Sequence, residues 1–69
     1  MATIRFSGKN EVHSLEISTG SQPSARRVTR GFYDKWVANG QPVISFESEH
    51  STGFRTLVKR NGRYYTRRT

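Results

Sequence analysis

The dipeptide Asn61-Gly62 constrains the fold of this chain more than any other feature of its sequence. Asparagine and glycine tolerate the positive φ angles of a two-residue type I′ turn, and here they separate two strand-like segments, residues 54–60 and 63–68. A two-residue turn also fixes the register, so we predict a β-hairpin. Its expected pairs are Arg60 with Arg63, Lys59 with Tyr64, Val58 with Tyr65, Leu57 with Thr66, Thr56 with Arg67 and Arg55 with Arg68.

Alternation of side chains along the hairpin strands predicts which residues face the core. We expect Phe54, Val58 and Tyr65 to point inward, because they are large and mostly apolar. The residues of the opposite phase are then expected on the outer face: Arg55, Leu57, Lys59, Tyr64, Thr66 and Arg68. In that arrangement Arg55 lies opposite Arg68, and such a like-charge pair costs stability unless an anion lies between the two side chains.

Residues 24–39 have the pattern of an amphipathic helix. Ser24 or Ser21 can cap its first turn, and Asn39-Gly40 followed by Pro42 is a strong stop signal. One stripe at helical spacing contains Ala25, Val28, Thr29, Phe32 and Trp36, and the opposite side carries Arg26, Arg27 and Arg30. The pattern predicts an aromatic inner face and a basic outer face.

Residues 3–7, 12–18 and 43–48 alternate as strands do, which gives the element order ββαβββ. This order predicts an α+β fold in which a small antiparallel sheet packs against the single helix. A chain of 69 residues has room for one core, so residues 1–69 form a single domain, with residues 66–69 expected to be flexible. Only 32% of the residues are hydrophobic, and the aromatic side chains therefore supply most of the core.

The positive charge is concentrated in two segments. The net charge is +7, and nine of the twelve basic residues are arginines, whose planar guanidinium suits bidentate recognition of phosphate and stacking on flat rings. Residues 26–35 sum to +3 and residues 55–69 to +6 with no acidic residue. The hairpin is therefore the main candidate for binding a polyanion, and the helix segment is a secondary one.

Residues that could support catalysis or metal binding are few. The chain has no cysteine, and its two histidines, His13 and His50, lack the spacing of a metal site. His50 follows Glu47 and Glu49, but we interpret this segment as a solvent-exposed acidic loop rather than an acid–base site. We expect no enzymatic activity and no metal, cofactor or small-molecule substrate.

The sequence contains no long apolar run, and its first residues lack the apolar stretch of a signal peptide. We therefore expect a protein with no membrane partner that acts in the cytoplasm of a bacterium or a host cell. The general style of a tiny basic α+β protein is similar to that of small phage or plasmid regulators.

These observations predict a small basic regulator that binds DNA or RNA mainly through phosphate contacts. The expected primary contacts are Arg55, Lys59, Arg60, Arg63, Tyr64, Arg67 and Arg68, and the secondary contacts are Arg26, Arg27 and Arg30. The alternative is a phage-type modulator that binds an acidic surface of a host protein machine, such as RNA polymerase or a CRISPR complex. Arginine and tyrosine suit both functions, because both are enriched in protein-binding hot spots.

Overall fold

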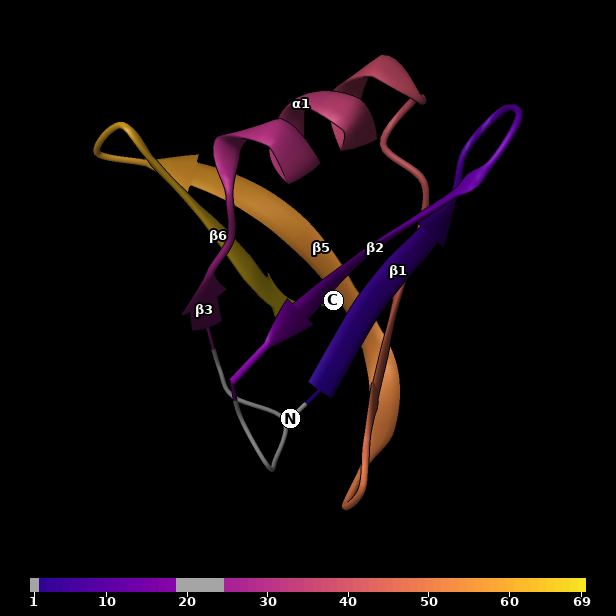
Figure 1. Cartoon of the computed structure of the whole chain (residues 1–69). Helices are drawn as coiled ribbons and strands as arrows, with labels where there is room; N and C mark the ends of the chain where they lie inside the picture. The colour runs from indigo at the N-terminus through magenta and orange to yellow at the C-terminus, as the bar shows by residue number, and fades with distance from the viewer. Residues whose placement is uncertain (1, 19–24) are drawn as a thin grey trace.

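The structure, a computed structural model, describes residues 2–18 and 25–69. The elements in chain order are β1 (Ala2–Ser7), β2 (Val12–Ile17), β3 (Ala25–Arg27), α1 (Arg30–Ala38), β4 (Ile44–Ser48), β5 (Thr52–Arg60) and β6 (Arg63–Arg68). All six strands belong to one antiparallel sheet with the order β2-β1-β4-β5-β6-β3 (Figure 1). The α+β class is confirmed, but the chain order is not the predicted ββαβββ, because a third strand precedes the helix.

The β5–β6 hairpin has the turn and the register that its sequence predicts. Asn61 and Gly62 have φ angles of 51° and 74°, as a type I′ turn requires. The register pairs Arg60 with Arg63 and continues without a slip to Arg55 opposite Arg68. Residues 66–68 form the end of β6, and the flexibility expected for residues 66–69 stays a prediction about motion.

Helix α1 begins later than the sequence predicts. Thr29 is its N-cap, and its hydroxyl accepts a hydrogen bond of 3.2 Å from the backbone N–H of Phe32. The predicted start near residue 24 is therefore wrong, and the proposed caps Ser21 and Ser24 lie outside the described residues. Ala25–Arg27 instead form β3, because pairing with β6 satisfies their backbone groups.

The end of α1 agrees with its stop signal. Gly40 has a φ of 85°, a left-handed conformation that glycine adopts without a steric penalty. The side chain of Asn39 donates to the carbonyl of Lys35 at 2.7 Å, and the indole N–H of Trp36 donates to the carbonyl of Pro42 at 2.8 Å. These bonds turn the chain back toward the sheet at the point where β4 begins.

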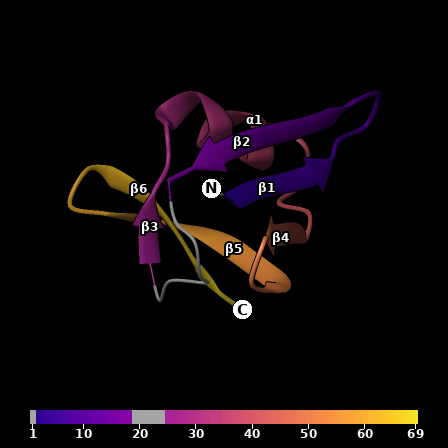
Figure 2. The same cartoon turned by 60° about the horizontal axis from the view of Figure 1, so that its bottom comes forward.

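The sheet is strongly curled, and α1 lies across one open end of it (Figures 1 and 2). Strands β2 and β3 are the two ends of the strand order, and the curl brings them toward each other. The guanidinium of Arg26 on β3 donates to the backbone carbonyl of Ser18, just after β2, across this gap. We call the gap between the two end strands the seam.

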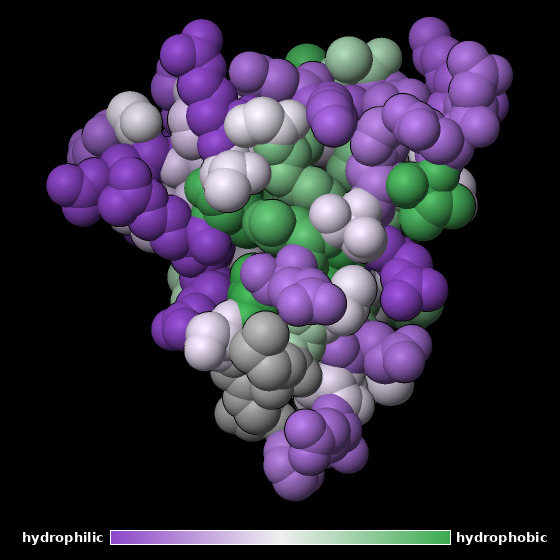
Figure 3. All heavy atoms as spheres, viewed as in Figure 1, coloured by the Kyte–Doolittle hydropathy of each residue, from purple (hydrophilic) through white to green (hydrophobic). Residues whose placement is uncertain are grey.

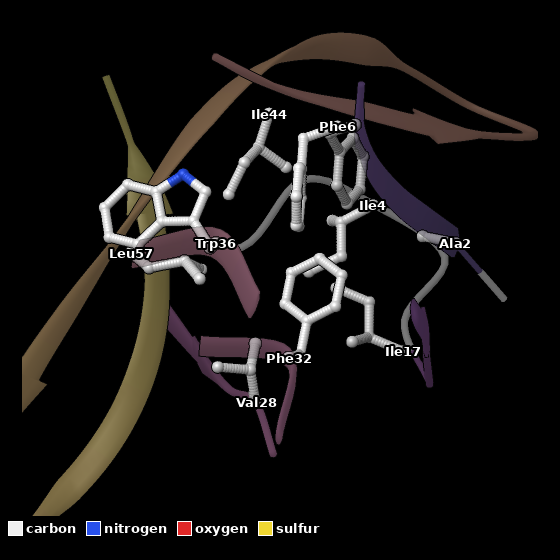
Figure 4. Close-up of a cluster of buried hydrophobic side chains, with 10 residues drawn as sticks. Ala2, Ile4, Phe6, Ile17, Val28, Phe32, Trp36, Ile44 and Leu57 are labelled. Atoms are coloured by element: carbon white, nitrogen blue, oxygen red, sulfur yellow. The ribbon is translucent and has the colours of Figure 1, made fainter. Parts of the chain in front are cut away.

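The inside of the curl holds one hydrophobic core (Figure 4). Its buried members are Ala2, Ile4, Phe6, Ile17, Val28, Phe32, Trp36, Ile44, Phe46 and Leu57. The rings of Phe6 on β1 and Phe32 on α1 meet edge to face, with their centroids 5.3 Å apart. The helix is therefore fixed to the sheet by aromatic contacts, and the inner surfaces of the strands are committed to the core.

Candidate nucleic-acid interface

The hairpin has the predicted register but the opposite phase. Arg55, Leu57 and Thr66 point into the core, with exposed fractions of 0%, 4% and 0%. Phe54 points outward and is 62% exposed. The expectation that Phe54 faces the core and Arg55 faces solvent is therefore wrong. All the remaining side chains of the hairpin also lie on the face opposite to the expected one.

Arg55 tolerates burial because it is paired by hydrogen bonds and packed on a ring. Its Nε donates to the hydroxyl of Thr66 at 3.0 Å, and one terminal nitrogen donates to the carbonyl of Thr66 at 3.1 Å. Its guanidinium carbon lies 5.7 Å from the ring centroid of Phe46. Desolvation lowers the pKa of Arg55, and the positive charge of Arg68 lowers this pKa further. Arg55 is thus a structural residue rather than an exposed phosphate contact.

The outer face of β5, β6 and β3 carries an ordered array of basic side chains. Its three rows are Arg60 and Arg63, then Val58, Tyr65 and Arg27, then Thr56, Arg67 and Ala25. Directly opposed residues in such rows have Cβ atoms about 5 Å apart. We define Arg27, Arg60, Arg63 and Arg67, together with Tyr65, as the basic sheet face.

None of the four arginines of the basic sheet face forms an ion pair with an acid among the described residues. All four of its arginines are exposed. Among the described residues, the ion pairs join His13 to Glu11 and Arg30 to Asp34, and neither involves this face. Four cations on one three-stranded surface create a positive potential that attracts a polyanion. Figure 3 shows hydrophilic side chains gathered over the β5–β6 turn.

A depression lies in the middle of the basic sheet face. It has a volume of about 340 Å³ and is lined by Ala25, Val58, Arg60, Tyr65 and Arg67. Tyr65 and Val58 are half-buried, so the ring and the aliphatic side chain form an apolar floor, with guanidinium groups at the rim. An apolar floor with polar groups at its edge is the usual construction of a site for a flat ligand group.

Several predicted contact residues lie on the inner side of the hairpin instead. Lys59 is exposed, and its amine lies 5.8 Å from the ring centroid of Tyr64. Tyr64 packs against Tyr33 of α1, with their ring centroids 4.6 Å apart. Arg68 shares the inner phase of Arg55 but is exposed near the end of the sheet. Tyr64 is therefore mainly a packing residue, and Tyr65 is the tyrosine of the outer face.

The seam forms a second hollow, with a volume of about 770 Å³. It is lined by residues 15–18, 26–30 and 62–64. Arg27 and Arg63 line this hollow as well as belonging to the basic sheet face, so the two surfaces are continuous. Figure 3 shows hydrophobic side chains between the strands that flank the seam and hydrophilic groups around them.

Two of the three arginines predicted for the helix surface lie on a strand instead. Arg26 and Arg27 lie on β3, so their placement on the outer face of a helix is wrong. Arg30 is the first residue of α1, and its Nε lies 3.5 Å from a carboxylate oxygen of Asp34. The strand pairing of β3 brings Arg27 beside Tyr65, although the two are far apart in the sequence.

Tyr65 and Phe54 are the candidate contact residues that the sequence analysis missed. Both were assigned to the core because aromatic side chains are usually buried. In the observed phase the inward-pointing residues include Leu57 and Thr66, which are suitable core residues, and these were the only sequence signal for it. The same phase also places Arg55 inside, which is unusual for an arginine. Because arginine was expected to be exposed, both strands of the hairpin were assigned the wrong inner face.

Within residues 2–18 and 25–69 the chain has no helix that is long and apolar enough to cross a membrane. No protein-family model matches the chain, and no curated protein or solved structure is significantly similar to it.

Proposed function

We propose that this protein is a non-enzymatic regulator that binds nucleic acid through the basic sheet face, mainly by phosphate contacts. The observation that carries the proposal is the placement of Arg27, Arg60, Arg63 and Arg67 on one surface, where none of them forms an ion pair among the described residues. Guanidinium groups bind phosphate oxygens through paired, charge-assisted hydrogen bonds. A net charge of +7 adds long-range attraction for any polyanion.

The spacing of these arginines suits a phosphate backbone better than a single anion. Arg27 and Arg67 lie on neighbouring strands in adjacent outward rows, and Arg60 and Arg63 lie at the turn. Outward rows on a strand are about 6.6 Å apart, so the charges form a track rather than a cluster. Arg26 and Arg30, which line the seam, extend this track as secondary contacts, and Lys59 and Arg68 contribute at its margins.

The test is a titration of the purified protein with duplex DNA, single-stranded DNA and RNA across a salt series. The double variant Arg63→Glu/Arg67→Glu should abolish binding, because phosphate contacts dominate the affinity. The matched control is Arg5→Glu/Lys9→Glu, which makes the same charge change at exposed positions in β1 and in the β1–β2 loop. If both variants weaken binding equally, overall charge and not the basic sheet face is responsible.

The alternative function, binding of an acidic surface on a protein machine, is favoured by one observation. Phe54 is 62% exposed on the same outer face as the arginines, and aromatic residues beside arginine are common at protein interfaces. Its test is co-purification with RNA polymerase or a CRISPR complex from nuclease-treated extract. The alternative would replace the first proposal if two results are obtained. The wild-type protein, but not Phe54→Ser, must retain the partner complex, and the wild-type protein must not bind nucleic acid at low salt.

A further inference from the structure

We infer that the ligand of the basic sheet face is a single-stranded nucleic acid, one base of which stacks on Tyr65 in the central depression. This inference rests on the proposed function and names its substrate class. Sequence-tolerant binding of single strands combines a basic track for the backbone with aromatic rings for the bases. Tyr65 lies in the middle row of the basic sheet face, between Val58 and Arg27.

The depression has the parts that a base requires. Val58 and Ala25 give it an apolar lining, and Arg60 and Arg67 stand at its rim. A guanidinium at this position can stack on a base or contact the phosphate beside it. Because charged arginines stand at the rim, the depression suits a ligand that combines a flat ring with a negative charge better than an uncharged apolar group.

The number of strands in the face disfavours a duplex. Neighbouring strands are about 4.8 Å apart, so the backbones of β5, β6 and β3 alone span roughly 10 Å. The major groove admits a helix or a two-stranded ribbon, whereas this face consists of three paired strands. Tyr65 is also half-buried between its neighbours and does not project as a wedge between stacked base pairs. An unpaired base, by contrast, can turn toward the ring.

Phe54 provides a second ring on the same face. It lies four residues before Val58 on β5, which corresponds to about 13 Å along the strand. Its side chain is 62% exposed and does not belong to the hydrophobic core. A single strand that starts near Arg60, crosses Tyr65 and follows β5 reaches Phe54. We therefore assign Phe54 as an outer stacking position and Tyr65 as the central one.

The experiment compares a thymidine oligonucleotide with an abasic strand of the same length and with duplex DNA. The abasic strand keeps the phosphates and lacks the rings, so the difference in affinity isolates base contacts. The wild-type protein should bind the thymidine strand more tightly than the abasic strand at the same salt concentration. In Tyr65→Val the affinity for the thymidine strand should fall by about 5- to 100-fold, toward the level of the abasic strand.

The matched control is Tyr65→Phe, which keeps the ring and should bind as the wild type does. Valine retains a high strand propensity, and an unchanged emission from Trp36, which is 5% exposed, shows that each variant is folded. Phe54→Val should give a smaller loss than Tyr65→Val.

Equal affinity for all three ligands, with no effect of Tyr65→Val, would overturn the inference and leave the proposed function standing. Absence of binding to every ligand at low salt would instead remove the proposed function itself.

Discussion

Arg55 donates two hydrogen bonds to Thr66, one to its hydroxyl at 3.0 Å and one to its carbonyl at 3.1 Å, and both side chains are fully buried. This contact lies on the face of the hairpin that packs into the core. With Arg55 and Thr66 inside, the alternation of the strands turns Tyr65, Arg63 and Arg67 outward. The proposed binding surface thus lies opposite a polar contact in the core.

Thr66→Val should destabilise the protein by about 1–3 kcal/mol. The two side chains have nearly the same shape, but valine removes the oxygen that accepts from Nε of Arg55 and leaves a buried donor without that partner. Urea unfolding followed by Trp36 fluorescence measures the change in the free energy of unfolding. The control Thr52→Val alters an exposed residue of β5 and should change the stability by less than about 0.5 kcal/mol.

The double variant Arg55→Met/Thr66→Val should be more stable than the sum of the two single effects predicts. Removal of both partners leaves fewer unsatisfied polar groups in the core than removal of one. A double-mutant cycle of urea midpoints measures this coupling. Additive effects would show that the contact between Arg55 and Thr66 contributes no coupling energy.

Gly31 and Gly62 should respond to alanine in opposite directions. Gly62 has a φ of 74°, so Gly62→Ala should cost about 1 kcal/mol and loosen the β5–β6 turn. Gly31 lies in the first turn of α1, and an added Cβ meets no atom within 4 Å. Gly31→Ala should therefore stabilise the protein by about 0.4–1 kcal/mol. Thermal unfolding followed by circular dichroism compares the two variants, and a shift in the same direction would contradict one of the two assignments.

Thr29→Ala should destabilise the protein by about 1 kcal/mol through the loss of the helix cap. The hydroxyl of Thr29 accepts from the backbone N–H of Phe32, and alanine leaves this N–H without its acceptor. Thr29→Ser keeps the hydroxyl and should retain most of the stability. Because Ser24 was the alternative cap, Ser24→Ala is a direct comparison, and a larger loss there would contradict the helix start at Arg30.

Arg27→Gln should reduce the salt dependence of nucleic-acid binding by the same amount as Arg63→Gln. Each phosphate contact adds about 0.7 to the slope of log affinity against log salt for a single strand and about 0.9 for a duplex. Arg27 reaches the site only through the pairing of β3 with β6, so the measurement tests this tertiary arrangement. Arg5→Gln, an exposed position on β1, should leave the slope almost unchanged.

Local sequence signals predicted the hairpin and the end of the helix, because the residues concerned act on their own backbone. Asn61-Gly62 fixed the register of β5 and β6, and Asn39-Gly40 marked the helix end. The start of the helix was mispredicted because residues 25–29 also fit a helical stripe. Only the open edge of β6, which is a tertiary feature, selects a strand for Ala25–Arg27.

The location of the candidate site was predicted in part. The concentration of charge pointed to the hairpin, which supplies Arg60, Arg63 and Arg67. The phase of the strands could not be obtained from hydrophobicity, because the buried set contains Arg55 and the exposed set contains Phe54. The burial of Arg55 is compensated by its hydrogen bonds to Thr66, a contact that no local pattern encodes.

The basic sheet face is assembled from chain segments on both sides of the helix, with Arg27 before α1 and the other three arginines after it. An excised hairpin peptide would therefore keep most of the charge of the site but not its geometry, and two strands alone are at best marginally stable in water. The unfolded chain likewise keeps its net charge of +7 and its attraction for polyanions. Heating should consequently abolish base discrimination at the unfolding transition, while weak, non-selective adhesion to nucleic acid persists above it.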